Sequence, residues 1–200
     1  MFNINTFVRH GVLALSLGCA ALAAQAAPTT YHIAVDTAAY GANGSLDTTV
    51  GSTNSAALLL ASMANYSAGF NGVDPLYSGA YQTTATGYAL TNGSGYNYLS
   101  QLVSFGSILS FDVTFSGSYF DVAGTEATGF DVALYDAAGS FLGDVVRFNF
   151  ATTGTDRITY VNGLGNATLV DANAVPEPTQ LVLMLTALAM MGVMVKRRQG

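Results

Sequence analysis

Few side chains in this chain are suited to catalysis, and histidine is among the scarcest of them. Within residues 27–174 the only histidine is His32, because His10 and the single cysteine, Cys19, both lie in residues 1–26. A Ser-His-Asp triad would have to use His32, and a zinc site needs three or four histidine, cysteine or carboxylate ligands. His32 falls on the polar side of an alternating stretch, so we expect a solvent-exposed histidine rather than a catalytic one.

Carboxylates suit two other kinds of site. A glycosidase needs two of them at a suitable separation, and the candidate pairs are Asp131 with Glu126 and Asp112 with Asp121. Calcium takes several oxygen ligands, and the candidate ligands at one edge of the fold are Asp121, Glu126, Asp131 and Asp136. No EF-hand or aspartate-rich repeat is present, and turn-capping aspartates explain the same positions. We therefore expect no enzymatic activity and no cofactor, with calcium as the alternative.

Tyrosines offer a different option, the stacking of sugar rings. Those in polar, glycine-rich segments are Tyr77, Tyr81, Tyr88, Tyr96 and Tyr98, whereas tryptophan is absent. An exposed tyrosine presents an apolar ring with a polar tip, so Tyr96 and Tyr98 are the candidate contacts for a glycan such as an exopolysaccharide. Half-buried strand tyrosines are the competing interpretation.

Charge excludes one class of partner. Residues 27–174 carry two arginines against eleven carboxylates, a net charge of about −9. Nucleic-acid binding requires clustered lysine or arginine, so we exclude it. The segment has no cysteine, which also rules out disulfides and thiolate metal sites within it.

Short strands are expected to position these residues. Residues 108–120 alternate apolar and polar side chains, so one face packs into a core and the other meets water. Residues 56–70 are ambiguous between helix and strand, and we favour strand; residues 69–79 read as a loop. Further strands are expected at 31–36, 46–50, 81–90, 96–103, 130–134, 146–150, 158–161 and 167–170, with a hairpin turn at 136–140. About nine or ten strands and no amphipathic helix predict an all-β fold, an antiparallel β-sandwich of the jelly-roll type.

The N-terminus has the pattern of a secretory signal peptide, residues 1–26. A basic pair at 9–10 precedes an uncharged apolar stretch at 11–24, and the residues that fit the cleavage rule are Ala24, Ala26 and Ala27. This pattern implies export through the Sec translocon and cutting by signal peptidase. Ser16 stands where a lipoprotein signal needs an aliphatic residue before Cys19, which speaks against lipidation.

The C-terminus, residues 175–200, combines three parts in order. The first is the motif Val175, Pro176, Glu177 and Pro178, followed by Thr179; the last is the basic tail at 196–200 with Lys196, Arg197 and Arg198. Between them an apolar segment, 180–195, predicts a short transmembrane helix, since its 15 uncharged residues from 181 to 195 span roughly 22 Å against a hydrocarbon core of about 30 Å. The prolines hold the Glu177 carboxylate on an extended stretch beside the membrane, and the cations mark a cytoplasmic stop-transfer end.

This arrangement resembles the PEP-CTERM sorting signal of Gram-negative bacteria. The resemblance implies recognition by an exosortase, an inner-membrane cysteine transpeptidase, with cleavage near the motif and export to the cell surface or an extracellular (biofilm) matrix. The strand patterns at 31–37, 107–113 and 130–136 are similar to PEP-CTERM proteins with an uncharacterised β-rich ectodomain, which implies no activity. An uncut tail anchor is the alternative.

We therefore expect an exported structural protein whose β-sandwich ectodomain, residues 27–174, is anchored transiently in the inner membrane and then deposited outside the cell. The alternative is a carbohydrate-binding module for extracellular polysaccharide. A glycan hydrolase is the third hypothesis.

Overall fold

The computed structural model describes residues 28–51, 57–93, 96–122, 128–151 and 157–170. The expected signal peptide, the sorting motif with its transmembrane helix and basic tail, and Glu126 all lie outside the described residues. Within them are twelve β-strands and one short 3₁₀ turn, η1 (Ser118–Phe120), and no α-helix. No helix of this part of the chain has the length and apolarity needed to cross a bilayer.

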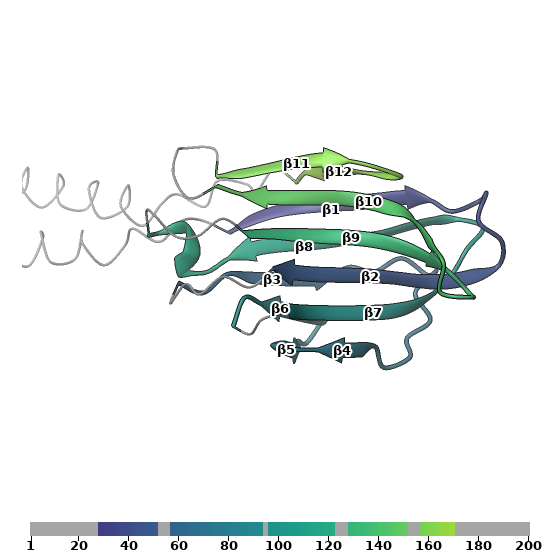
Figure 1. Cartoon of the computed structure of the whole chain (residues 1–200), viewed down its shortest axis with the longest axis horizontal. Helices are drawn as coiled ribbons and strands as arrows, with labels where there is room; N and C mark the ends of the chain where they lie inside the picture. Colours follow the sequence, from purple (N-terminus) through teal and green to yellow (C-terminus); the bar gives the residue numbers. More distant parts are fainter. Residues whose placement is uncertain (1–27, 52–56, 94–95, 123–127, 152–156, 171–200) are drawn as a thin grey trace, which may run out of the picture. The chain divides into compact units, whose positions relative to one another are not determined.

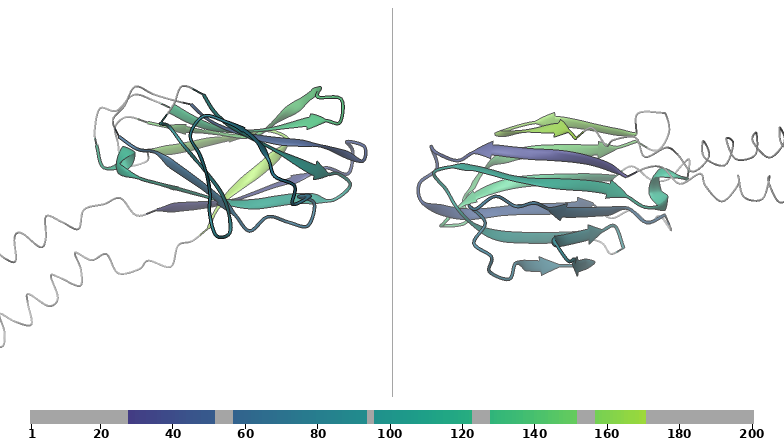
Figure 2. Two further views of the ribbon diagram at one scale, coloured as in Figure 1. Left: turned by 90° about the horizontal axis from the view of Figure 1, so that it is seen from below. Right: turned by 180° about the vertical axis from the view of Figure 1, so that it is seen from behind.

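The twelve strands form two six-stranded sheets, and every pair of neighbouring strands is antiparallel. Sheet A consists, in order across the sheet, of β12 (Gly165–Leu169), β1 (Thr29–Asp36), β8 (Ile108–Ser116), β3 (Leu60–Ala64), β6 (Gly87–Thr91) and β5 (Tyr81–Thr83). Sheet B consists of β11 (Ile158–Asn162), β10 (Phe141–Phe150), β9 (Thr128–Asp136), β2 (Asn43–Gly51), β7 (Tyr96–Ser104) and β4 (Leu76–Ser78). Sheet B lies in front of sheet A in Figure 1 and behind it in the right view of Figure 2. The predicted all-β sandwich is thereby confirmed.

The interior of the sandwich is built from alternate residues of the long strands. The inward side chains of β8 are at most 1% exposed: Leu109, Phe111, Val113 and Phe115. Phe115 has three further rings edge-on to it, with 4.9–5.4 Å between centroids: Phe130, Phe148 and Phe150. Such edge-to-face pairs add to the free energy gained by burying the rings. The apolar side chains that alternate along residues 108–116 therefore pack against sheet B and hold the two sheets together.

Tertiary pairing changes several of the predicted element boundaries. The ambiguous segment 56–70 contains a strand, β3, as favoured. The prediction of a loop over 69–79 is wrong for Leu76–Ser78, which pair with β7 although all three residues are exposed. The run at 81–90 is two strands joined by a turn in which the Thr84 N–H donates to the Gly87 carbonyl. The long strand predicted to Phe120 ends at Ser116, because Gly117 has a φ of 107° and starts the 3₁₀ turn.

The two side edges of the sandwich differ. At one edge the β11–β12 turn is tied to β10, since Gly163 N–H donates to the Val145 carbonyl at 3.0 Å and Leu164 N–H donates to the Asp144 carbonyl at 2.8 Å. The chain thus passes from sheet B to sheet A there. At the other edge β4 and β5 end the two sheets, and their tyrosines, Tyr77 and Tyr81, stack at 4.3 Å.

Two glycines with positive φ give a matched test of backbone geometry. Gly139 has a φ of 79° and open space where a Cβ would stand, whereas a Cβ on Gly117 would collide with the Leu58 carbonyl. We expect Gly139→Ala to cost about 1 kcal/mol of unfolding free energy and Gly117→Ala about 3 kcal/mol or more. Chemical denaturation measures both; equal losses would contradict the close approach at Gly117.

Candidate functional site

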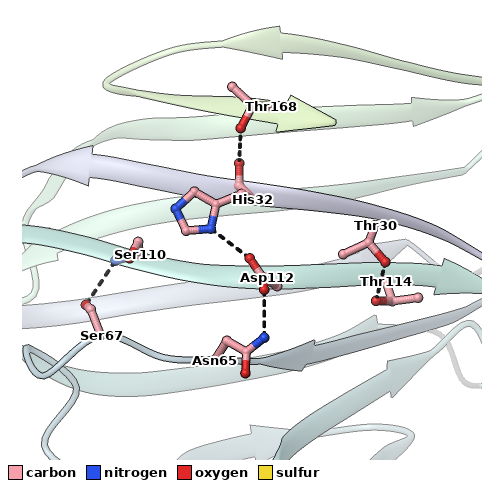
Figure 3. A network of polar contacts seen from close by, with 8 residues as sticks. All are labelled: Thr30, His32, Asn65, Ser67, Ser110, Asp112, Thr114 and Thr168. Atoms are coloured by element: carbon pink, nitrogen blue, oxygen red, sulfur yellow. Dashed lines mark hydrogen bonds and ion pairs between the residues drawn. The ribbon is translucent and has the colours of Figure 1, made fainter. Parts of the chain in front are cut away.

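Outside the core, one polar network lies on the outer face of sheet A (Figure 3). His32 on β1 and Asp112 on β8 are cross-strand neighbours, with 2.7 Å between Nδ1 and Oδ1. The other carboxylate oxygen of Asp112 accepts a hydrogen bond of 2.7 Å from Asn65 Nδ2. The side chains of His32 and Asp112 are 45% and 23% exposed. The expected exposure of His32 is therefore found, but its hydrogen bond with Asp112 is a contact that the sequence did not predict.

This network joins three strands rather than assembling a triad. Among the described residues no serine hydroxyl hydrogen-bonds to the His32 ring. Asn65 follows β3 with a φ of 55°, a left-handed conformation that asparagine tolerates. Its contact with Asp112 links the end of β3 to β8 and, through His32, to β1.

The candidate calcium ligands that the structure describes have protein partners of their own. Asp131 accepts a hydrogen bond of 2.6 Å from Arg147 Nε. Asp136 accepts the backbone N–H groups of Ala138 and Ser140, which lower its pKa. Asp131 and Asp136 stand five residues apart on β9, about 17 Å along the strand, so they cannot ligate the same ion.

No three histidine, cysteine or acidic side chains of the described ranges form a group that could hold a metal. Asp121 follows η1, and Glu126 lies outside those ranges. Calcium binding therefore stays a prediction. Of the two carboxylate pairs considered for glycoside hydrolysis, one includes Glu126, and in the other Asp112 is engaged with His32 and Asn65.

The candidate glycan contacts lie together on the outer face of sheet B. Tyr96 and Tyr98 are stacked, with ring centroids 6.1 Å apart and an interplanar angle of 17°. Tyr96 is 62% exposed, and Tyr98 is half-buried and donates a hydrogen bond of 3.2 Å to Asp47 Oδ2. Ser100 donates to Asp47 Oδ1 at 2.5 Å. We call Asp47, Tyr96, Tyr98 and Ser100 the tyrosine face.

Asp47 is the chemically distinctive member of the tyrosine face. It is half-buried, and among the described ion pairs none includes it. Burial raises the pKa of Asp47, while hydrogen bonds from Ser100, Tyr98 and Ser45 act in the opposite direction. Desolvating a carboxylate without a cation is unfavourable, so burial makes ionisation of Asp47 less favourable in the folded chain. Such a carboxylate could accept hydrogen bonds from the hydroxyls of a bound molecule.

A pocket lies near the β4–β5 edge, and we call it the edge pocket. It has a volume of about 360 Å³ between the 66–73 loop, the β5–β6 turn and β7. Its lining residues are Tyr66, Ser67, Phe70, Asn71, Gly72, Val73, Thr83, Thr84, Thr86, Gly87, Tyr88, Gln101 and Leu102. Two buried atoms in this lining, Tyr66 Oη and Gln101 Oε1, make no hydrogen bond of good geometry, although the Gln101 side chain lies close enough to Tyr66 to lower its pKa.

Tyr66 and Gln101 were not predicted as site residues from the sequence, although one signal was present. Gln101 occupies an inward position of β7, between the buried Leu99 and Val103. A polar residue at an apolar position of an alternating strand marks either a buried hydrogen bond or a site. One of the other tyrosines singled out from the sequence, Tyr88, lines this pocket. The ring of Tyr81 contacts those of Tyr77 and Tyr88, with centroids 4.3 Å and 5.8 Å apart.

Comparison with known proteins gives no relative from which a role could be transferred. The chain matches no protein-family model, no curated protein and no solved structure.

The raised pKa of Asp47 makes a pH-dependent prediction. A carboxyl group with a higher pKa in the folded state binds its proton more tightly there, so its ionisation costs stability, and this cost disappears as pH falls below the ordinary value of 3.8. We expect Asp47→Asn to be more stable than wild type at pH 7, with the difference shrinking toward acid pH. Denaturant titrations across pH measure this difference.

Asp131→Asn is the matched control, because it removes a carboxylate that pairs with Arg147 on the same sheet. It should not stabilise the protein at pH 7. A loss of stability in Asp47→Asn at neutral pH would show that the carboxylate is a net stabilising group.

Proposed function

We propose that this chain is an exported, non-enzymatic β-sandwich protein that an exosortase sorts to the cell surface or extracellular matrix. The observation that carries the proposal is the order of three parts at the C-terminus: the 175–179 motif, the apolar segment and the basic tail. The apolar stretch and cleavage rule at residues 1–26 support export. In this proposal the sandwich is the exported part of the protein.

The chemistry of the sandwich suits a protein that works outside the cell. Its segment has no cysteine to oxidise, and a net charge of about −9 favours solubility through self-repulsion. We further infer a jelly-roll arrangement, supported by the neighbouring order β1-β8-β3-β6 in sheet A and β2-β7-β4 in sheet B. Successive strands that alternate between two sheets in this way form interlocked Greek keys.

Polysaccharide binding is a second candidate function, favoured by the tyrosine face. Tyr96 offers an exposed ring backed by Tyr98, and Asp47 lies beside them as a hydrogen-bond acceptor. Aromatic rings stack on the apolar faces of sugars, while carboxylates accept bonds from their hydroxyls. Because the protein is acidic, a neutral polysaccharide is the expected partner rather than an anionic one.

Replacement of the Pro-Glu-Pro triplet tests the sorting proposal. Changing Pro176, Glu177 and Pro178 to alanine removes both the extended backbone and the carboxylate. We expect the variant to remain full-length in the inner membrane, as seen by cell fractionation and immunoblotting. Thr179→Ala, just outside the triplet, should be processed like wild type. Normal release of a shortened form from the triple variant would refute recognition through the triplet.

Binding to extracellular polysaccharide tests the second candidate. In a pull-down with increasing polymer, we expect saturable binding that falls about tenfold or more in Tyr96→Ala and Tyr98→Ala, because the stacked rings are lost. Tyr77→Ala is the matched control, since Tyr77 is 61% exposed but lies off the outer face of sheet B. Equal binding by all three variants and wild type would remove the tyrosine face from consideration.

A further inference from the structure

We propose that the edge pocket is a binding site for a single neutral sugar ring, separate from the tyrosine face. Its walls come from parts of the chain that are distant in sequence: the 66–73 loop, the β5–β6 turn and β7. The loop is held on both sides, because Ser67 N–H donates to the Ser110 carbonyl and Asn71 N–H donates to the Leu102 carbonyl. These two backbone hydrogen bonds hold the loop against both sheets.

The first argument is a pair of buried polar atoms that make no hydrogen bond of good geometry. Tyr66 Oη and Gln101 Oε1 are both buried in the lining, and Gln101 as a whole is only 7% exposed. Buried polar atoms are nearly always hydrogen-bonded, so an exception calls for a missing partner. The tyrosine hydroxyl can donate and the amide oxygen can accept. A ligand hydroxyl, which does both, matches the pair.

The second argument is that the Tyr66 hydroxyl is fixed in position. Its ring is stacked on Phe111, with centroids 5.6 Å apart and 20° between the planes, and Phe70 lies edge-on at 4.6 Å. Burial is the main cause that raises the pKa of Tyr66, with the neighbouring Tyr88 adding to it and a hydrogen-bond interaction with the Gln101 side chain opposing it. The hydroxyl thus stays protonated and remains a donor. A fixed donor on a packed ring is the arrangement that favours ligand binding through preorganisation.

The third argument is the composition and size of the walls. The described residues that line the pocket include no charged side chain; aromatic rings form one part, and threonines at 83, 84 and 86 supply hydroxyls. The volume of about 360 Å³ falls within the roughly 300–1,000 Å³ of small-molecule sites. Asp74 contributes to raising the pKa of Tyr88, after burial and Tyr81, so negative charge lies nearby. An anionic ligand is disfavoured, and a neutral, hydroxyl-rich ring fits.

A titration with neutral sugars tests the site. The full chain is held in a zwitterionic detergent without a sugar headgroup, and glucose, galactose, mannose and N-acetylglucosamine are added to millimolar concentrations. The amide NMR signals of Tyr66 and Gln101 report binding. We expect at least one of the four sugars to shift these signals with saturation. If none does, the pocket holds only water and the proposal is overturned.

Two conservative variants separate a binding role from a structural one. Tyr66→Phe and Gln101→Met each remove one of these buried polar atoms and keep the packing volume, so we expect about tenfold weaker sugar binding with a denaturation midpoint no lower than wild type. Tyr160→Phe is the matched control, because it removes a partly exposed hydroxyl on β11, at the opposite edge of sheet B, and should leave this binding unchanged. Unchanged binding in both pocket variants, or a lowered midpoint in both with no loss of affinity, would contradict the proposal.

Discussion

The packing of aromatic rings between the two sheets is the interaction on which the rest of this structure depends. Phe115 of sheet A meets Phe130, Phe148 and Phe150 of sheet B, and Tyr31 adds a contact with Phe148 at 4.9 Å. No disulfide can form within residues 27–174, so burial of apolar surface is the main driving force available to the domain. Because the inner faces of both sheets are filled by this packing, the candidate sites lie on the outer faces and near the β4–β5 edge.

The sequence predicted those parts of the fold in which local pattern and tertiary packing agree. The alternation over 108–116 is visible in the chain because its inner side chains are apolar and its outer ones are serine, threonine and aspartate. The β9–β10 hairpin could be found for the same reason, helped by Gly139. β4 could not, since Leu76–Ser78 are all exposed and become a strand only by pairing with β7. Strand order across each sheet is likewise a tertiary property that no short segment encodes.

In the candidate sites, too, some features follow from local sequence pattern and others depend on the tertiary fold. Tyr96 and Tyr98 share one face of a strand, so their proximity follows from the period of two. Their hydrogen-bond partners cannot be predicted in this way. The Tyr98 hydroxyl donates to Asp47, which is 51 residues away in the sequence, and in sheet A His32 contacts Asp112, which is 80 residues away. Tyr66 and Gln101 meet in the edge pocket only because the 66–73 loop crosses from sheet A to sheet B beside β7. Sequence patterns thus locate single residues of a site, and the fold decides which of them act together.

Export of the sandwich without its two ends is the central claim, and the intact mass of the protein recovered from outside the cells tests it most directly. We expect a polypeptide that starts at Ala27 or Pro28 and ends near the 175–179 motif, with any attached group visible as added mass. A chain found only in the inner membrane, intact to Gly200, in a strain with a working exosortase would contradict this claim.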